Sequence, residues 1–259
     1  MSSYSLRILN LVGFAITVSV NAMASAYALN WRTTAQVSDL YPTVVTPAGI
    51  TFSIWGVIYL MLGVFVIAPF LMRQTSVDYV RKIGPLFLLS CVFNIAWLLL
   101  WHYDYIAFSV LAMLALFLTL LAIYLVVGVG RLRPPLRERL AFQVPFSLYL
   151  GWITVAFVVN IAAALVYLGW DRLGLSEPQW GVIAVGLTTL IALTSAFSKR
   201  DAVYVLVVLW ALLGIYLKPG VVAEISNALL AGGVVIVVAL AFVLIRSRSR
   251  LRSPEKMAS

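Results

Sequence analysis

Charged residues divide this chain into long apolar stretches. Eight stretches of 16 or more residues contain no Asp, Glu, Lys or Arg: 8–31, 40–72, 83–103, 105–130, 140–170, 178–198, 202–217 and 225–245. A helix that crosses the bilayer core needs about 20 residues, with a usual range of about 17–25. The pattern therefore predicts helices near 6–28, 49–72, 83–101, 105–129, 143–168, 180–197, 202–217 and 223–245. The 202–217 stretch is marginal, and could form a short or re-entrant helix.

Composition supports a membrane protein. Of the 259 residues, 63% are hydrophobic and 10% are charged, and the mean hydropathy is +1.05. Soluble domains carry roughly 45–50% apolar and about 25% charged residues. The few charges of this chain could not cover the surface of a soluble globule. The stretches are too long and too uniformly apolar for barrel strands. The predicted fold class is an all-α, polytopic helical membrane protein with eight transmembrane helices.

The basic residues predict which side of the membrane each loop occupies. If eight spans alternate, one side receives 15 Lys and Arg residues, and the other receives only Arg32, Arg172 and Lys218. Cytoplasmic loops carry the Lys/Arg excess, so both termini are expected in the cytoplasm. This rule also explains the polybasic tail at 246–259 without nucleic-acid binding. The first apolar segment is too long for a cleaved signal peptide.

Conventional catalytic and coupling groups are scarce. No Asp, Glu, Lys, Arg or His lies in the middle of a predicted span, which counts against proton pumps, ion-coupled carriers and voltage sensors. The single histidine, His102, and the single cysteine, Cys91, cannot build a metal site, and His102 is expected in an interfacial turn. Phosphate-binding loops and hydrolase motifs are also missing from the sequence. We therefore predict no metal site and no catalytic residue, and an enzymatic role is not favoured.

Aromatic residues carry the strongest signal. Of eight tryptophans, four at span ends are interpreted as an interfacial belt, namely Trp31, Trp101, Trp170 and Trp180, and four lie within spans, namely Trp55, Trp97, Trp152 and Trp210. Helical spacing places aromatic and Asn side chains along one stripe in each of three spans: Phe52, Trp55 and Tyr59; Asn94, Trp97 and Trp101; and Tyr149, Trp152, Ala156 and Asn160. Facing stripes would wall a cavity for a flat apolar ligand. Plain helix packing with Asn hydrogen bonds is the alternative, and periodicity alone favours it.

Three blocks, in order, resemble a known family. They are YPTVVTPAGITFSIWGVIY at 41–59, FNIAW at 93–97 and VPFSLYLGWIT at 144–154. Together they are similar to the tryptophan-rich sensory protein (TspO/MBR) family, the bacterial branch of the translocator, or peripheral benzodiazepine receptor, proteins. The resemblance covers about residues 1–168 and, because it is to a bacterial branch, implies the bacterial inner membrane as the location. It implies a five-helix bundle whose first loop closes over a pocket for porphyrins and similar flat ligands.

The resemblance also implies the binding residues. The loop and second-helix motif supplies Pro47, Gly49, Phe52 and Trp55; the third-helix motif supplies Asn94 and Trp97; and the fifth supplies Pro145, Phe146, Tyr149 and Trp152. Tyr59 is added as a candidate because it shares the stripe of Phe52 and Trp55. The sequence departs from the family pattern at Tyr149, where Trp is common, at Asn160, which lies a turn late, and in 109–119, which lacks the family's acidic residue. Gly49 is expected to allow a close backbone approach, and Pro42 and Pro47 favour an extended, turn-rich loop. The loop is either a lid or an ordinary connector, and the resemblance favours a lid.

These observations define a domain plan and several candidate functions. The plan is a five-helix ligand-binding bundle at 1–168, a three-helix membrane extension at 169–245 and a polybasic cytoplasmic tail at 246–259. The leading hypothesis is a membrane protein that binds a hydrophobic small molecule, with a tetrapyrrole (porphyrin) as the candidate ligand and no cofactor otherwise indicated. Alternatives are an uncoupled transporter, an assembly or regulatory subunit, and a host for light-driven oxidation of a bound tetrapyrrole. Expected partners are membrane lipid and, through the last three helices, a second copy or a membrane partner.

Overall fold

The computed structural model describes residues 3–26, 29–72 and 76–252, and every regular element among them is helical. The long helices are α1 (Ser3–Ser25), α3 (Ile54–Leu71), α4 (Ser76–His102), α5 (Ile106–Val126), α7 (Val144–Tyr167), α8 (Glu177–Thr194), α9 (Ala202–Tyr216) and α10 (Ala223–Arg252). The short elements are α2 (Thr34–Leu40), α6 (Leu136–Glu138), the 3-10 helices η1 (Gly49–Ser53) and η3 (Arg172–Gly174), and the π-helical segments η2 (Arg139–Gln143) and η4 (Ser195–Lys199).

Seven helices in the described part of the chain are long and apolar enough to cross a membrane. They correspond to seven of the eight predicted spans, and the all-α polytopic membrane class is confirmed. The remaining stretch forms α9, an apolar helix of 15 residues. At 1.5 Å per residue, α9 is about 22 Å long, shorter than the roughly 30 Å hydrocarbon core. The count of eight is therefore seven full-length helices and one short one.

Helices α4 and α10 extend furthest past the predicted boundaries into charged sequence. Helix α4 begins at Ser76 rather than near residue 83, so its first turns include Asp78, Arg81 and Lys82. Helix α10 continues to Arg252, so the polybasic segment begins as helix, whereas 253–259 lie outside the described residues. Charges mark where a helix leaves the hydrocarbon, and not where its hydrogen bonding ends.

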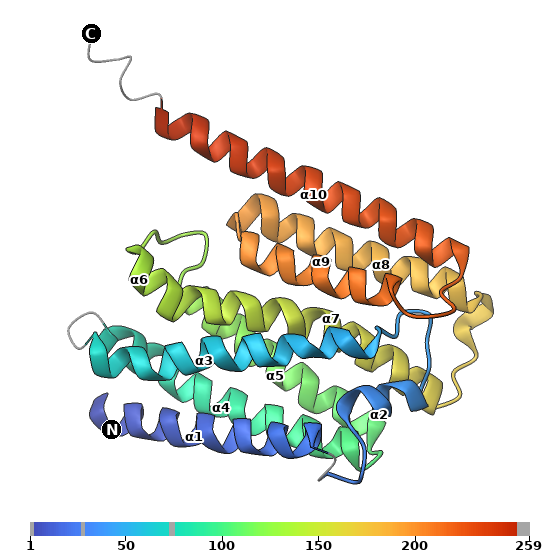
Figure 1. The fold of residues 1–259 in the computed structure, drawn as a ribbon, viewed down its shortest axis with the longest axis horizontal. Coiled ribbons are helices and arrows are strands. Elements are labelled where there is room, and N and C mark those ends of the chain that lie inside the picture. Colours follow the sequence, from blue (N-terminus) through green and yellow to red (C-terminus); the bar gives the residue numbers. More distant parts are fainter. Residues whose placement is uncertain (1–2, 27–28, 73–75, 253–259) are drawn as a thin grey trace.

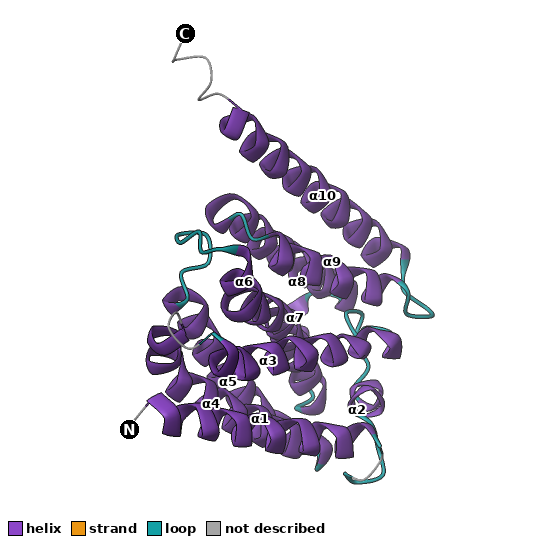
Figure 2. Ribbon diagram, turned by 60° about the vertical axis from the view of Figure 1, so that its left-hand side comes forward, coloured by secondary structure: helices purple, strands orange, loops and turns teal. Residues whose placement is uncertain are grey.

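Helix α7 is the centre of the molecule. Helices α3 and α5 pack against one side of it and α9 packs against the other, while α4 packs on α5, and α1 packs on α4 and α3 (Figure 1). Helix α10 lies on the outer side of α8 and α9, away from α1 (Figure 2). Consequently α7 is the most buried of the spans, and the last three helices continue the packing of the first five.

Polar contacts join α9 to the first five helices. The Tyr204 hydroxyl donates to Thr154 Oγ1 on α7 at 2.8 Å, and the Tyr124 hydroxyl on α5 donates to Asp201 at 3.0 Å. Asp201 is buried and caps α9 by accepting from the backbone N–H of Val203 and Tyr204. A buried carboxylate with three donors has its charge compensated, and it fixes the start of α9.

The connections fall on two sides. The start of α1, the α6 connection and the end of α10 lie at one end of the bundle, and α2 and the α9–α10 connection lie at the other (Figure 1). We call the second end the α2 side. Its loops carry Arg32, Arg172 and Lys218, the three basic residues that sequence alternation separates from the rest. Of the 15 basic residues assigned to the opposite side, Arg73 and Lys256 lie outside the described residues.

Candidate functional site

The first loop contains a helix that was not predicted. Thr33 accepts from Gln36 N–H at 3.2 Å, while the Gln36 side chain accepts from Thr33 N–H at 2.8 Å, so a capping box starts α2. The Thr-x-x-Gln signal is present in the sequence and would have predicted this start. The expectation of an extended, turn-rich loop was therefore wrong for 34–40, although 42–48 are non-helical.

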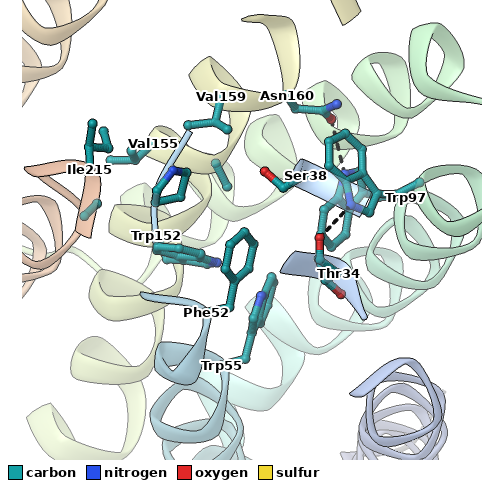
Figure 3. A pocket seen from close by; sticks show the side chains of 14 residues that line it. Thr34, Ser38, Phe52, Trp55, Trp97, Trp152, Val155, Val159, Asn160 and Ile215 are labelled. Carbon is teal, nitrogen blue, oxygen red and sulfur yellow. Dashed lines mark hydrogen bonds between the residues drawn. The ribbon is translucent and has the colours of Figure 1, made fainter. Parts of the chain in front are cut away.

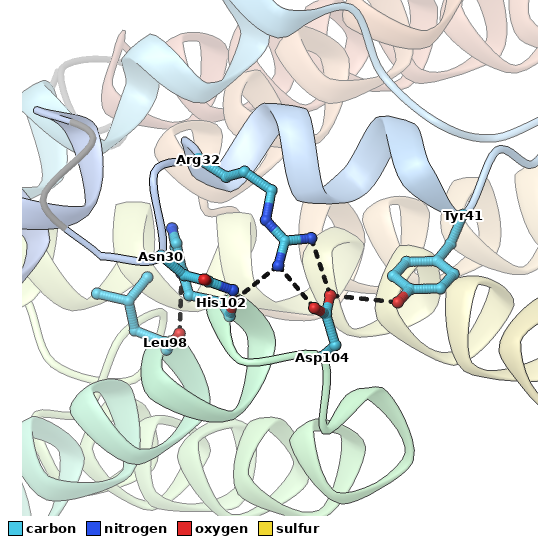
Figure 4. Close-up of polar contacts among 6 residues, drawn as sticks. All are labelled: Asn30, Arg32, Tyr41, Leu98, His102 and Asp104. Carbon is cyan, nitrogen blue, oxygen red and sulfur yellow. Dashed lines mark hydrogen bonds and ion pairs between the residues drawn. The ribbon is translucent and has the colours of Figure 1, made fainter.

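One end of the loop is clasped to the α4–α5 turn (Figure 4). The Arg32 guanidinium donates to both carboxylate oxygens of Asp104, at 2.6 and 3.1 Å, and the Tyr41 hydroxyl donates to the same carboxylate at 3.3 Å. Asn30 Nδ2 donates to the His102 carbonyl at 2.8 Å. The hydrogen bond to Asp104 raises the pKa of Arg32, while burial and then Asp104 raise the pKa of Tyr41. Both groups therefore keep their protons at neutral pH, and their hydrogen bonds to Asp104 persist.

His102 itself is not an interfacial turn residue. Its side chain is fully buried at the end of α4, and Nδ1 lies 2.9 Å from the Leu98 carbonyl. The turn follows at Asp104, which has a positive φ of 63°.

The other end of the loop is fastened to α9. Ala48 N–H donates to the Gly214 carbonyl at 2.8 Å, and Trp210 Nε1 donates to the Thr51 carbonyl at 3.0 Å. A Cβ built on Gly214 would lie 2.1 Å from Thr51 Oγ1, so only glycine permits this approach. The close approach had been expected at Gly49, which is wrong: a Cβ there would make ordinary contact with Ala35 at 3.8 Å. The loop segment from Ala48 to Ser53 covers the site, and we call it the roof. Its attachment depends on α9, a helix outside the predicted 1–168 bundle.

Under this roof, aromatic rings gather around Trp55. Tyr59 and Trp97 stack on it, with ring centroids 5.5 and 6.0 Å away and interplanar angles of 15° and 27°. Tyr149 and Trp152 meet it edge-on at 5.9 and 6.2 Å. Stacked and edge-on pairs at such distances add about 0.5–1.5 kcal/mol each beyond burial. The three stripes expected from helical spacing do converge.

Asparagines connect the rings to neighbouring helices. Asn21 Nδ2 on α1 donates to Asn94 Oδ1 at 2.8 Å, and Asn94 Nδ2 donates to the Tyr149 hydroxyl at 2.8 Å. Trp97 Nε1 donates to Asn160 Oδ1 at 3.2 Å. In hydrocarbon such bonds hold helices at a fixed rotation, because a polar group without a partner is costly there.

Several buried polar side-chain atoms among the described residues have no hydrogen-bond partner, and two of them, Trp152 Nε1 and the Tyr59 hydroxyl oxygen, belong to this ring cluster. Trp152 Nε1 has no hydrogen-bond partner, although its side chain is 3% exposed. Phe52 packs edge-on against the same ring at 6.0 Å (Figure 3). A buried N–H without a partner costs about 1–3 kcal/mol, so this position favours an acceptor from outside the chain.

A small cavity of about 30 Å³ lies beside these rings (Figure 3). Its walls include Trp55 from α3, Trp97 from α4, Trp152 and Ala156 from α7, and Ile215 from α9. A water needs roughly 10–15 Å³ by this measure, whereas sites for organic ligands span about 300–1,000 Å³. The cavity therefore has room for two or three waters and is too small for an organic ligand.

Most of the predicted site residues lie at the cavity, and three lie elsewhere. Those that line the cavity or contact its rings are Pro47, Phe52, Trp55, Tyr59, Asn94, Trp97, Tyr149 and Trp152. Gly49 instead is exposed on the loop, and Phe146 packs against Phe65 at 4.9 Å and Phe87 at 6.4 Å, in a separate cluster. Pro145 is in the first turn of α7, as proline at a helix start favours.

Sequence reasoning missed several walls of the cavity. Trp101, interpreted as part of the interfacial belt, is 3% exposed, lines the cavity and donates to the Thr34 carbonyl at 3.2 Å. Thr34 and Ser38 from α2 and Ala211 from α9 also line it. For Trp101 the signal was its place on the Asn94–Trp97 stripe; for Ala211 none existed.

Fold and site together define a class. This is a multi-pass helical membrane protein with a roofed, tryptophan-lined cavity at its most buried helix. The family whose model is described as TSPO-like protein matches residues 7–244, and the chain belongs to that family. The match extends through α8 and α9 into α10, beyond the region of the sequence resemblance. Neither a curated protein nor a solved structure matches the chain.

Proposed function

We propose that this TSPO-like membrane protein binds a flat hydrophobic ligand, with a porphyrin as the candidate, among α3, α4 and α7 beneath the first loop. The observation that carries the proposal is the gathering of Tyr59, Trp97, Tyr149 and Trp152 around Trp55. Flat π-surfaces in a desolvated site favour a flat aromatic guest.

Binding requires the site to open. Carbon atoms in contact are about 3.5–4.0 Å apart, so a planar molecule held between two rings needs them about 7–8 Å apart. Trp55 and Trp97 are 6.0 Å apart, and the cavity holds about 30 Å³. The ligand would therefore separate the α3 and α4 rings and lift the loop that ends in η1. The apparent affinity would be reduced by the fraction of molecules that are closed.

The polar groups suit a mostly apolar guest with an acceptor. Trp152 Nε1 would donate to a ring nitrogen or carbonyl of the ligand, removing the cost of an unpaired donor. The two Asn-centred chains already have their partners within the protein. Most of the affinity would come from apolar area, at about 25 cal/mol per Å².

Two alanines on α7 give a matched test. Ala156 lines the aromatic cavity, whereas Ala162, on the same helix, lines a different depression between α7 and α8. Protoporphyrin is titrated into purified full-length protein and followed by the shift of its absorption band. Ala156→Phe fills the cavity and should weaken binding at least about tenfold, equivalent to about 1.4 kcal/mol, while Ala162→Phe should bind as the wild type does. Equal affinity in all three proteins, or no binding by the wild type, would overturn the proposal.

We also propose that the α2 side faces outward across a bacterial inner membrane, with both termini in the cytoplasm. The support is the basic excess on the opposite side. A membrane-impermeant thiol reagent applied to spheroplasts should label Trp31→Cys, since Trp31 is 88% exposed, and should spare Arg137→Cys until the membrane is permeabilised. The reverse pattern would refute the orientation.

A further inference from the structure

A second, larger depression lies between α7 and α8. It encloses about 450 Å³, within the range of organic-ligand sites and far above the aromatic cavity. Helix α8 packs mainly on α10 and contacts α7 only sparsely, which leaves the two helices apart. Val44 and Val45 of the first loop form a third wall. We call this depression the α7–α8 groove.

The groove is apolar along its length and open to the bilayer. Ala162 and Leu165 on α7 face Ala184 and Leu187 on α8, and the small alanines leave the space between them. Exposed residues on its rims include Val166, Ile183 and Leu187. At the depth of a spanning helix such exposure is to hydrocarbon, so the groove is reached from the lipid and not from water.

Its depth corresponds to one leaflet. Along α8 the lining runs from Glu177 at the helix start to Leu187, ten residues further on. At 1.5 Å per residue this is about 15 Å, half of the roughly 30 Å hydrocarbon thickness. The groove therefore begins at the membrane surface on the α2 side and ends near the midplane, which is the reach of a lipid chain.

The mouth carries both signs of charge and two indoles. Arg172 and Glu177 form an ion pair at 3.3 Å, with side chains 50% and 38% exposed. The rings of Trp170 and Trp180 lie 4.9 Å apart, and Trp180 Nε1 donates to the Arg172 carbonyl at 2.8 Å, which holds that ring at the mouth. A guanidinium binds phosphate, and a carboxylate beside aromatic faces binds an alkylammonium. This pairing complements a zwitterionic head group better than a purely anionic one.

We propose that the α7–α8 groove binds one zwitterionic phospholipid from the leaflet on the α2 side. An acyl chain lies between α7 and α8, its phosphate contacts Arg172, and its ammonium lies near Glu177 and the Trp170–Trp180 pair. The site is separate from the aromatic cavity and does not depend on porphyrin binding. It differs from a generic lipid-facing surface because it selects the head group and encloses the chain.

The test is native mass spectrometry of full-length protein in mild detergent with added phosphatidylethanolamine, phosphatidylglycerol or palmitate. The wild type should retain one phosphatidylethanolamine, and roughly two- to fivefold less phosphatidylglycerol at equal concentration, as expected of an exposed cation–π contact. Filling the groove with Ala162→Phe and Ala184→Phe together should reduce retention at least about tenfold. Ala156→Phe, in the aromatic cavity, is the matched control and should retain lipid normally.

Substitutions at the mouth of the groove keep the test decisive if the Ala162→Phe and Ala184→Phe double variant fails to fold. Glu177→Gln at the exposed mouth should abolish the preference for phosphatidylethanolamine, and Arg172→Gln should weaken retention of both phospholipids. Full retention by the groove-filled protein would overturn the site. Equal retention of the two phospholipids by the wild type, or retention of palmitate alone, would overturn the zwitterionic assignment. Loss of porphyrin binding with lipid retention intact would contradict only the proposed function.

Discussion

Gly214→Ala should release the loop that roofs the aromatic cavity. The added Cβ would lie 2.1 Å from Thr51 Oγ1, 2.4 Å from Cγ2 and 2.8 Å from Cβ. Rotating the Thr51 side chain exchanges the first two atoms but leaves the Cβ–Cβ contact below 3.0 Å, a distance that real Cβ atoms essentially never show. The backbone of η1 must therefore move away from α9.

The cost follows from the two hydrogen bonds at this contact. Moving η1 by about 1 Å stretches Ala48 N–H to the Gly214 carbonyl, now 2.8 Å, and Trp210 Nε1 to the Thr51 carbonyl, now 3.0 Å, beyond useful length. Each bond contributes about 0.5–1.5 kcal/mol net, so the closed loop loses about 1–3 kcal/mol. The open fraction should rise by about 5- to 150-fold.

Hydrogen exchange measures this opening without any ligand. Amide exchange of the peptide that contains residues 44–53 should accelerate by about 5- to 150-fold in Gly214→Ala, while exchange within α7 stays unchanged. Gly56→Ala is the matched control, because its Cβ would meet nothing within 4 Å. If the loop exchanges equally fast in Gly214→Ala, Gly56→Ala and the wild type, α9 does not hold the roof closed.

Three further changes test other contacts by thermal unfolding in detergent. Asn160→Leu leaves Trp97 Nε1 without its acceptor and should destabilise the protein by about 0.6–1.7 kcal/mol; an unchanged melting temperature would mean that the bond is not formed. Asp201→Ala should cost about 0.5–2 kcal/mol through loss of the α9 cap, and Asp201→Asn should recover most of it, so equal losses would argue against capping. Arg32→Gln should cost less than about 1 kcal/mol because the pair with Asp104 is partly exposed, and the difference from wild type should shrink in high salt.

The span pattern, and which loops share an end of the bundle, could be read from the sequence because the physics is local. A charge in hydrocarbon is costly wherever its neighbours are, so gaps between charges mark the spans, and loop charges follow the membrane. The aromatic stripes around Trp55, Trp97 and Trp152 could likewise be read, since spacing along one helix determines which residues share a face. The sequence also contains the signal for the start of α2, the capping box at Thr33, although this helix was not predicted.

Which faces meet was decided only by the tertiary structure. Spanning helices here are apolar on every side, because lipid and protein interior are equally apolar, so hydropathy does not reveal an inward face. That is why Trp101 was assigned to the interfacial belt, why Gly49 was preferred to Gly214 as the close contact, and why α9 was left out of the predicted site. Charges along the chain indicate which segments are spans, whereas the packing of α7 on α9 and the gap between α7 and α8 determined where the cavity and the groove lie.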